Sequence, residues 1–405
     1  MRILHTADWH LGKRLDSFSR HEEQVATLNE ICAVADREKV DVVVIAGDLF
    51  DNFNPSNESI ELFFKICKQL TVNTEGVNRA VIAIAGNHDS PERIEAPDPL
   101  ARACGIIFSG FPNSKVSEFE LPSGLAVTKS DAGFIELKLP QFDYPLRVLL
   151  TPFANEERLR KYLGDNHREV ALRETVSQTW HTNLKNQPDL DKSVNILVSH
   201  LLFVSDKNAK IQEDEGERPI FVGTASAFFP EDVPDGLQYV ALGHLHRFHF
   251  VAKSRVPIVY SGSPLAYSFN EHNQDKYVVI VDVEPNKRAE IKEVPLKTAK
   301  KLLKIVAENP SHAIEELLKS PDALIQLSMK TETYLDGTIT QPIYDSHKGI
   351  VGNIIPLISE NTEGGTASRI VDFNDIEKMF LDYYKFKRRE EPSEALLNIF
   401  KEIMQ

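Results

Sequence analysis

The stretch "VIAIAGNHDS", residues 81–90, determines which fold and which chemistry we expect. It begins as a run without polar side chains, typical of a strand buried on both faces, and the run ends at Gly86. Asn87, His88 and Asp89 follow in direct succession. A strand that only fills a core would end in solvated turn residues, whereas these three side chains can bind a metal ion or transfer a proton. The stretch therefore predicts a functional site at the end of a buried strand.

The same order of apolar run, polar turn and amphipathic helix recurs over the first two-thirds of the chain. Helices are expected over about 21–38, 59–70 and 156–184, and hairpins over about 108–150. The alternation predicts an α/β fold with largely parallel central strands. The apolar runs are "RILHTAD", "DVVVIAGDLFD", "RAVIAIAGNHD", "RVLLTPF", "VNILVSHLL" and "QYVALGHLH".

Changes in composition suggest four parts of the chain. Residues 1–285 carry the repeated α/β pattern, and 286–358 contain enough strand and helix signals for a small α/β domain. Residues 359–372 begin as a polar, glycine-containing connector. Residues 373–405 predict two amphipathic helices separated at Pro392.

The overall composition describes an ordinary globular protein. Of its 405 residues, 42% are apolar and 26% are charged, and no stretch approaches the ~18 apolar residues of a membrane span. The amino-terminal sequence lacks the apolar region of a signal peptide, so a cytoplasmic location is expected. Cys32, Cys67 and Cys104 are far apart and in apolar surroundings, which predicts buried free thiols. The formal net charge of −14 argues against coating nucleic acid by bulk electrostatics.

Five strand ends carry polar groups of one chemical kind. In an open α/β sheet, the carboxyl ends of neighbouring strands line a common crevice, so we expect these groups to converge. Each is weak evidence alone, since a single histidine such as His200 after a strand usually has a structural role. Their joint occurrence favours a site. The groups are Asp8 and His10; Asp48 and Asp51; Asn87, His88 and Asp89; His200; and His244 with His246.

The donor atoms in this set indicate a pair of divalent cations. Every side chain offers an oxygen or an imidazole nitrogen and none offers a thiolate, which favours manganese or iron over a cysteine-type zinc site. There are too many donors for one tetrahedral ion, but they suit two ions about 3.5–4 Å apart that share a carboxylate. We expect structural roles for His5, His21, His249 and His272.

The motif series resembles the calcineurin-like metallophosphoesterase superfamily. "HTADWHLG", "GDLFD", "GNHDSPER", "FVGTASAF", "YVALGHLHR" and "YSGSPLAYSF" are similar, within it, to bacterial nuclease subunits that act with an SbcC-type ATPase. The resemblance is specific over roughly residues 1–283. It implies a sandwich of two mixed sheets flanked by helices, a small α/β capping domain and C-terminal helices.

The resemblance also implies roles for the individual residues. Manganese is the implied metal, with iron, magnesium and zinc as alternatives. One ion would be bound by Asp8, His10, Asp48 and His246, and the other by Asp48 as the bridge together with Asn87, His200 and His244.

The catalytic residues implied by the resemblance are His88 and Asp51. His88 would lie over the phosphate, as electrostatic stabiliser or proton donor to the leaving oxygen. Asp51 falls where relatives carry a carboxylate that orients this histidine, although some nuclease relatives have histidine there. Asp89 is expected to cap the following turn.

The implied activity is metal-dependent DNA cleavage in repair, recombination and replication: exonucleolytic on duplex ends, endonucleolytic on single strands or hairpins. The terminal helices would dock on the ABC/SMC-like ATPase, and a homodimer within a heterotetramer is implied. The alternative for these helices is packing on their own domain. Their apolar faces are Ile376, Met379, Phe380 and Tyr383, then Leu396, Ile399, Phe400 and Ile403.

Two other functions compete with a nuclease. One is hydrolysis of a non-DNA phosphoester, although "GDLFDNF" and "GNHDS" lack the arginine and the "GNHE" typical of Ser/Thr phosphatases. The other is a non-enzymatic scaffold, which the complete set of candidate ligands disfavours. Lys13, Arg14, Arg20 and Arg247 are near the site in sequence and are candidates for phosphate contacts.

Overall fold

In this computed structural model the chain divides into two compact units, Met1–Lys300 and Lys301–Gln405. The structure describes residues 1–358 except 17, 73–75, 77, 165–167, 207–226 and 332–334, and beyond 358 only Tyr384, Pro392, Leu396 and Leu397. Apart from these four residues, the expected connector 359–372 and the terminal helices at 373–405, with their apolar faces, lie outside the described residues.

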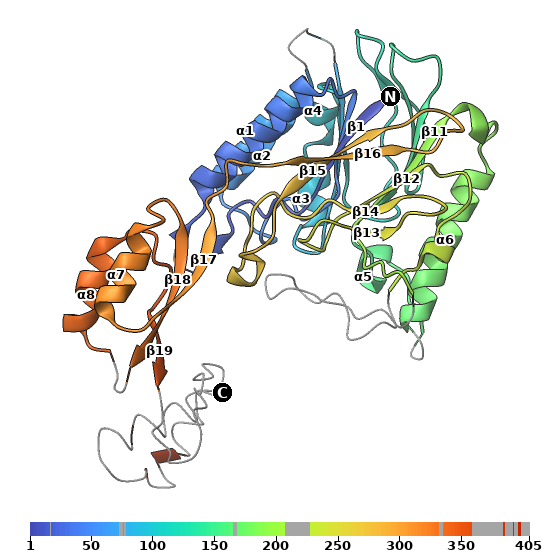
Figure 1. Cartoon of the computed structure of the whole chain (residues 1–405). Coiled ribbons are helices and arrows are strands. Elements are labelled where there is room, and N and C mark those ends of the chain that lie inside the picture. The colour runs from blue at the N-terminus through green and yellow to red at the C-terminus, as the bar shows by residue number, and fades with distance from the viewer. Residues whose placement is uncertain are drawn as a thin grey trace. The chain divides into compact units, whose positions relative to one another are not determined.

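The first unit contains a six-stranded mixed sheet. β1, β4, β5 and β6 are parallel, and β15 and β16 join antiparallel at one edge (Figure 1). The order is β16 (Glu290–Pro295), β15 (Tyr277–Asp282), β1 (Arg2–Thr6), β4 (Val42–Ile45), β5 (Ala80–Ile84) and β6 (Ile106–Ser109).

The second sheet of this unit has eight strands. β10, β11, β12 and β14 are parallel, whereas β7, β8, β9 and β13 are antiparallel to their neighbours, so the predicted hairpins between 108 and 150 are confirmed. The order is β13 (His249–Ala252), β14 (Ile258–Tyr260), β12 (Tyr239–Leu242), β11 (Val194–Ser199), β10 (Leu146–Thr151), β9 (Phe134–Lys138), β8 (Ala126–Asp131) and β7 (Phe119–Glu120).

Alternate residues of each central strand face different cores. Val42 and Val44 of β4 lie in the cluster between the two sheets, with Val148 of β10 and Ile196 of β11. Val43, the residue between them, belongs to the cluster under the helices of the opposite face. Because both faces are covered, β4 and β5 are apolar throughout, as parallel strands usually are.

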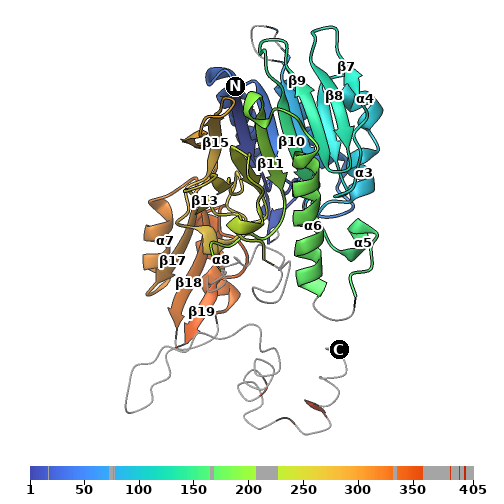
Figure 2. The ribbon, with the colours of Figure 1, turned by 90° about the vertical axis from the view of Figure 1, so that its right-hand side faces the viewer.

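Two long helices cover the outer face of the six-stranded sheet and one covers the eight-stranded sheet. α1 (His21–Arg37) and α2 (Asn57–Leu70) lie beside the first sheet, and α6 (Arg168–Lys185) lies across β10 and β11 (Figures 1 and 2). α1 and α2 confirm the predicted helices. In α6 the buried side chains Leu172, Val176, Trp180 and Leu184 follow the four-residue spacing of one helix face.

The single helix expected over 156–184 is wrong, because the structure has two. α5 (Glu156–Leu159) ends at Arg160, whose φ of 50° is the left-handed conformation that terminates helices. Gly164 has a φ of 92° in the segment that follows. The polar-apolar pattern of the sequence is continuous over both helices. The residue at the end of α5 is arginine rather than glycine, so the sequence carries no signal that the first helix ends there.

The remaining elements of the first unit are short. Among the described residues they are β2 (Arg14–Leu15), β3 (Phe18–Ser19), α3 (Pro91–Glu95) and α4 (Asp98–Arg102), with 3-10 helices at Leu190–Lys192, Pro230–Asp232 and Phe269–Glu271. The unit continues to Lys300 rather than ending at residue 285, because β16 pairs with β15 along its whole length.

In its described residues up to 358, the second unit contains a three-stranded parallel sheet with two helices. The elements are β17 (Leu302–Ala307), α7 (Pro310–Leu318), β18 (Leu324–Thr331), α8 (Gly337–Ser346) and β19 (Ile355–Ile358), with β18 in the middle of the sheet. Its core includes Ala313 and Leu317 of α7, Ile343 of α8 and Leu327 of β18. This is the small α/β fold expected for this region.

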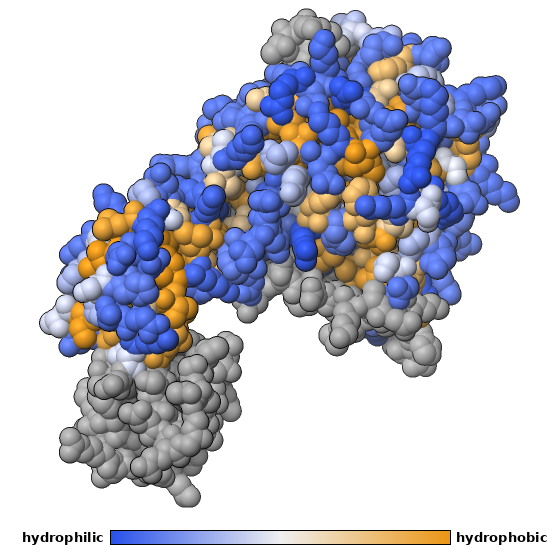
Figure 3. Space-filling model, in the orientation of Figure 1, coloured by the Kyte–Doolittle hydropathy of each residue, from blue (hydrophilic) through white to orange (hydrophobic). Residues whose placement is uncertain are grey.

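The exposed surface mixes hydrophilic and hydrophobic residues, as most protein surfaces do (Figure 3). Among the described residues, none of the helices has the length and apolar character needed to cross a bilayer. Cys32 and Cys67 are buried and unbridged as expected, while Cys104 is only half-buried.

Candidate metal centre

The five polar strand ends converge at one edge of the sandwich. β1, β4 and β5 are adjacent parallel strands of one sheet, and β11 and β12 are adjacent parallel strands of the other. Contacts then cross between the sheets. His200 Nδ1 lies 2.8 Å from the main-chain oxygen of Ala46, and the amide of His244 donates to Asp8 Oδ1 at 2.9 Å. The site therefore lies at the seam of the two sheets, rather than along one open sheet.

Two glycines allow the motif loops to approach one another. A Cβ at Gly86 would lie 2.1 Å from Asp48 Oδ1, and a Cβ at Gly243 would lie 1.9 Å from the main-chain oxygen of Ala46. No side chain fits at either distance, so the glycines of "GNHD" and "GHLH" are required by packing around the site.

Four of the candidate ligands have left-handed backbone conformations. The φ angles are 55° at Asp8, 43° at His10, 49° at Asp48 and 108° at His244. Such conformations are uncommon for residues other than glycine and cost on the order of 1–3 kcal/mol each. Their concentration at one place is typical of functional sites, where the fold holds side chains in directions that a relaxed backbone would not give.

Asp48 is at the centre of the cluster. Two groups have donor atoms within 4.8 Å of one another: Asp8, Asp48 and His200, and His10, Asp48 and His88. Asp48 Oδ2 lies 3.4 Å from His10 Nε2, and Asp48 Oδ1 lies 3.5 Å from His200 Nε2. A carboxylate shared by two groups of donors is the arrangement that a bridging ligand requires. The groups differ from the expected sets, because Asp8 is grouped with His200, and His88 with His10.

The other expected ligands lie around these two groups. His246 Nε2 is 3.0 Å from His10 Nε2, and Asn87 Oδ1 is 3.0 Å from His200 Nε2. The ring of His244 packs edge-on against that of His200, with centroids 5.6 Å apart. The structure thus brings together all seven residues that the resemblance implied as ligands.

The electrostatics of the cluster fit cations. Asp8 Oδ2 is buried and, within the described part of the chain, has no hydrogen-bond partner. Burial raises the pKa of Asp8 to about 7. Burial opposes a charge on His200, but the carboxylate of Asp48 outweighs it and raises the pKa of His200 to about 9. Without metal, protons therefore partly compensate the buried carboxylates, and divalent cations can replace them.

One contact of His88 is with the main chain of Asp51 rather than with its carboxylate. The atom of Asp51 beside His88 Nδ1 is the main-chain oxygen, at 2.7 Å, while the Asp51 carboxylate accepts a hydrogen bond from Lys13 Nζ at 3.0 Å. His88 is 3% exposed, and its ring is edge-on to that of His10 with centroids 4.7 Å apart. A main-chain carbonyl fixes the tautomer as well as a carboxylate does, and it does not depend on the residue type at position 51.

Comparison with known proteins places this geometry in a family. The profile for calcineurin-like phosphoesterases matches residues 1–248. The SbcD subunit of the SbcCD nuclease from Bacillus subtilis is 33% identical over 407 residues, covering 100% of this chain and 97% of that protein. The chain belongs to the SbcD family of calcineurin-like phosphoesterases. It is therefore a phosphoester hydrolase with the predicted metallophosphoesterase sandwich.

Other SbcD-family proteins match in the same way. The SbcD subunits of the SbcCD nucleases from Staphylococcus epidermidis and Rhodobacter capsulatus are 31% and 30% identical. The match with the Staphylococcus protein covers 79% of this chain and 75% of that protein. The match with the Rhodobacter protein covers 80% of this chain and 76% of that protein. The fold is also similar to the solved structure of a dimetal phosphatase from Danio rerio, with 11% sequence identity and a TM-score of 0.38. The match covers 72% of this chain and 98% of the phosphatase chain.

Asp89 has a larger role than the predicted turn cap. In this SbcD-family chain its buried carboxylate accepts hydrogen bonds from the amides of Leu49 at 3.0 Å, Phe50 at 2.9 Å and Gly86 at 2.8 Å. It thereby joins the loop after β4 to the loop after β5. Arg158, also buried, donates to the main-chain oxygens of Gly86 and Asp89 at 2.8 and 2.7 Å. No spacing rule links Arg158 to these motifs, so sequence inspection could not have found it.

Several residues near the site have structural roles. His5 is fully buried between the Tyr239 hydroxyl and the Leu242 main-chain oxygen, at 2.9 and 3.1 Å, as expected of a core histidine. Arg20 was a candidate phosphate contact, but it is buried and bonded to Glu23, with Nε 2.5 Å from Oε2. Its guanidinium is thus committed within the chain.

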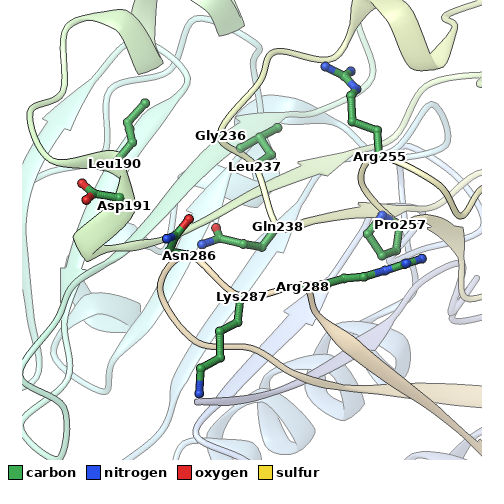
Figure 4. Close-up of a pocket in the computed structure, with 10 residues that line it drawn as sticks. All are labelled: Leu190, Asp191, Gly236, Leu237, Gln238, Arg255, Pro257, Asn286, Lys287 and Arg288. Atoms are coloured by element: carbon green, nitrogen blue, oxygen red, sulfur yellow. The ribbon is translucent and has the colours of Figure 1, made fainter.

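A cavity of about 400 Å³ lies away from the candidate ligands, at the amino-terminal ends of β11, β12 and β14 (Figure 4). Its residues include Gln238, Arg255 and Lys287, and the last two side chains extend in opposite directions. Lys287 lies 2.5 Å from Glu284, and Arg255 donates to the Pro230 main-chain oxygen at 2.7 Å. The side chains of Arg255 and Lys287 thus do not converge on one point of this cavity.

Proposed function

We propose that this chain is the metal-dependent nuclease subunit of an SbcC–SbcD-type complex, acting on DNA phosphodiesters in repair, recombination and replication. The observation that carries the proposal is the pair of donor groups sharing Asp48. It occurs in a chain that matches the SbcD subunit of the Bacillus subtilis SbcCD nuclease along its full length. We propose double-strand exonuclease activity and endonuclease activity on single strands or hairpins.

Seven residues would hold the two ions. When bound, the ions would supply Lewis acidity and a hydroxide nucleophile at neutral pH. Manganese is the proposed metal, because the donors are carboxylate, amide and imidazole groups. The proposed ligands are Asp8, His10, Asp48 and His246 for one ion, and Asp48, Asn87, His200 and His244 for the other.

His88 is the proposed proton donor. Its Nδ1 donates to the main-chain oxygen of Asp51, so its Nε2 is directed away from that carbonyl. As an imidazolium the ring can deliver the Nε2 proton to the leaving oxygen of the DNA strand, a contribution typically worth about 10²–10⁴ in rate. We also propose that the carboxylate of Asp51, which lies 3.0 Å from Lys13 Nζ and 3.8 Å from His10 Nδ1, holds Lys13 near the site.

The negative net charge of the chain opposes binding to the DNA phosphates, so a partner protein is needed for affinity. With a net charge of −14, a basic ATPase partner would carry much of the affinity for the phosphate backbone. We propose that residues 373–405 bind this partner, that the second unit acts as the capping domain, and that the subunit forms a homodimer in the complex. A cytoplasmic location is proposed with it.

Cleavage assays with purified protein test the proposal. With Mn²⁺ the chain should degrade single-stranded DNA and open a hairpin, EDTA should stop both reactions, and Asp48→Asn should show neither. Co-purification with an SbcC-type ATPase should add ATP-dependent cleavage of duplex ends. Hydrolysis of p-nitrophenyl phosphate without any cleavage of DNA would instead favour a non-DNA phosphoesterase.

A further inference from the structure

A buried ion pair lies behind the metal centre in a segment to which the mechanism assigns no role. Glu271 ends a short 3-10 helix, Phe269–Glu271, and Lys276 lies just before β15. Lys276 Nζ is 2.5 Å from Glu271 Oε2, and the exposed fractions of the two side chains are 6% and 0%. Burying two charges costs several kcal/mol for each ion, so a pair at this place calls for an explanation beyond stability.

Both members of the pair contact His246. Glu271 Oε1 lies 3.6 Å from the Nδ1 atom of the His246 ring. Lys276 Nζ donates to the His246 main-chain oxygen at 2.9 Å and to Ser263 Oγ at 3.0 Å. The charged pair is thus hydrogen-bonded to the backbone of His246, and its carboxylate is the acidic group that faces the ring at 3.6 Å.

The position of the carboxylate bears on which ring nitrogen is available. A carboxylate beside Nδ1 favours the tautomer with its proton on that atom, which leaves the lone pair of Nε2 available. Nε2 of His246 faces Nε2 of His10 at 3.0 Å, on the side of Asp48. Neutral metal-bound histidines commonly have a carboxylate behind them in this way, and the partner sets both orientation and basicity.

We propose that Glu271 and Lys276 are positioning residues that fix the ring of His246 and thereby set the affinity of the ion that His10 and His246 share. The inference rests on the proposed function for the assignment of these histidines as ligands. It assigns a role to "SFNEHNQDK", residues 268–276, which the motifs of the metal centre do not include.

A purely structural role is the competing explanation. Glu271 Oε1 also accepts hydrogen bonds from the amides of Tyr267 at 2.9 Å and Ser268 at 3.0 Å, so it stabilises its own turn. That role predicts a loss of folding stability without a selective effect on one ion. The two explanations therefore differ in what a metal titration measures.

The test is Mn²⁺ binding to Glu271→Gln, followed by EPR of free manganese, together with the melting temperature of the metal-free protein. Glutamine keeps the size of the side chain and can keep the oxygen that accepts the two amides and lies beside His246 Nδ1, but it removes the negative charge behind the ring and the ion pair with Lys276. We expect the dissociation constant of one of the two ions to rise about 10–100-fold, with the other unchanged. The matched control is Glu136→Gln, because Glu136 forms a similarly buried pair with Arg147 at 2.8 Å in the eight-stranded sheet. The control should bind both ions as the wild type does.

Two results would overturn the inference. One is wild-type affinity for both ions in Glu271→Gln. The other comes from the double variant Glu271→Gln/Lys276→Met, which leaves no unpaired buried charge and so tests the case in which the single variant does not fold. Wild-type binding of both ions by this double variant would show that the pair serves folding only. If the wild type binds manganese but cleaves no DNA, the proposed function fails while the titration still decides this inference.

Discussion

Asp89 provides a sharp test of how the two central motifs are held together. Its carboxylate accepts three main-chain amides, two from the loop after β4 and one from the loop after β5. In Asp89→Ala all three donors stay buried without a partner, and each costs about 1–3 kcal/mol. The sum gives a loss of at least about 3 kcal/mol in the free energy of unfolding. In Asp89→Asn one oxygen remains, so the expected loss is smaller, about 1–3 kcal/mol.

The loss should also reach the metal centre. Leu49 directly follows Asp48, and the Gly86 amide lies in the same turn as His88. When the amides are released, the loops no longer hold Asp48 in its left-handed conformation, and the affinity for manganese should fall. Urea unfolding of the EDTA-treated protein measures the loss in the free energy of unfolding. A Mn²⁺ titration of the folded variant measures the loss in affinity for manganese.

The control is Asp322→Ala, which removes an exposed carboxylate from the second unit. This substitution should change the free energy of unfolding by no more than about 0.5 kcal/mol. If Asp89→Ala unfolds at the same urea concentration as this control, the three hydrogen bonds do not hold the loops and the reasoning is refuted.

Three further predictions concern single residues. His88→Gln should lower cleavage about 10²–10⁴-fold while two manganese ions still bind, and loss of bound metal would contradict its role as proton donor. Asp48→Asn should weaken both ions and Asp8→Asn mainly one, as counted by metal analysis after gel filtration; equal effects would argue against Asp48 as the bridge. Burial lowers the pKa of His5 to about 3 from 6.5, so its neutral form stabilises the fold fully above pH 6.5 and stability falls as the pH drops toward 3. In His5→Gln, which can keep both hydrogen bonds, the slope of stability against pH between 4 and 6 should be smaller by about 1.4 kcal/mol per pH unit, and an unchanged slope in urea titrations would show that His5 does not titrate this way.

The features that could be predicted from the sequence are those that depend on the order of neighbouring residues. Apolar runs gave the central strands, and the side chains directly after them form the cluster around Asp48, because parallel strands of a sheet end at one edge. The break between α5 and α6 could not be predicted, since Arg160 is an unusual residue for a left-handed cap. The roles of Asp89 and Glu271 depend on contacts between loops that meet only in the folded chain. The contact between His88 and the main chain of Asp51 could not be predicted for another reason: a main-chain oxygen carries no sequence signal.

The left-handed conformations at Asp8, His10, Asp48 and His244 affect how substitutions at these positions should be interpreted. A β-branched replacement would remove a donor atom and add conformational strain at once, so a scan that records only activity would confound misfolding with lost chemistry. Glycine removes the side chain and relieves the strain, while asparagine tolerates this backbone and keeps the shape of aspartate. A glycine variant that is more heat-resistant than the parent and catalytically dead would reveal stability that the fold gives up at this position to support catalysis.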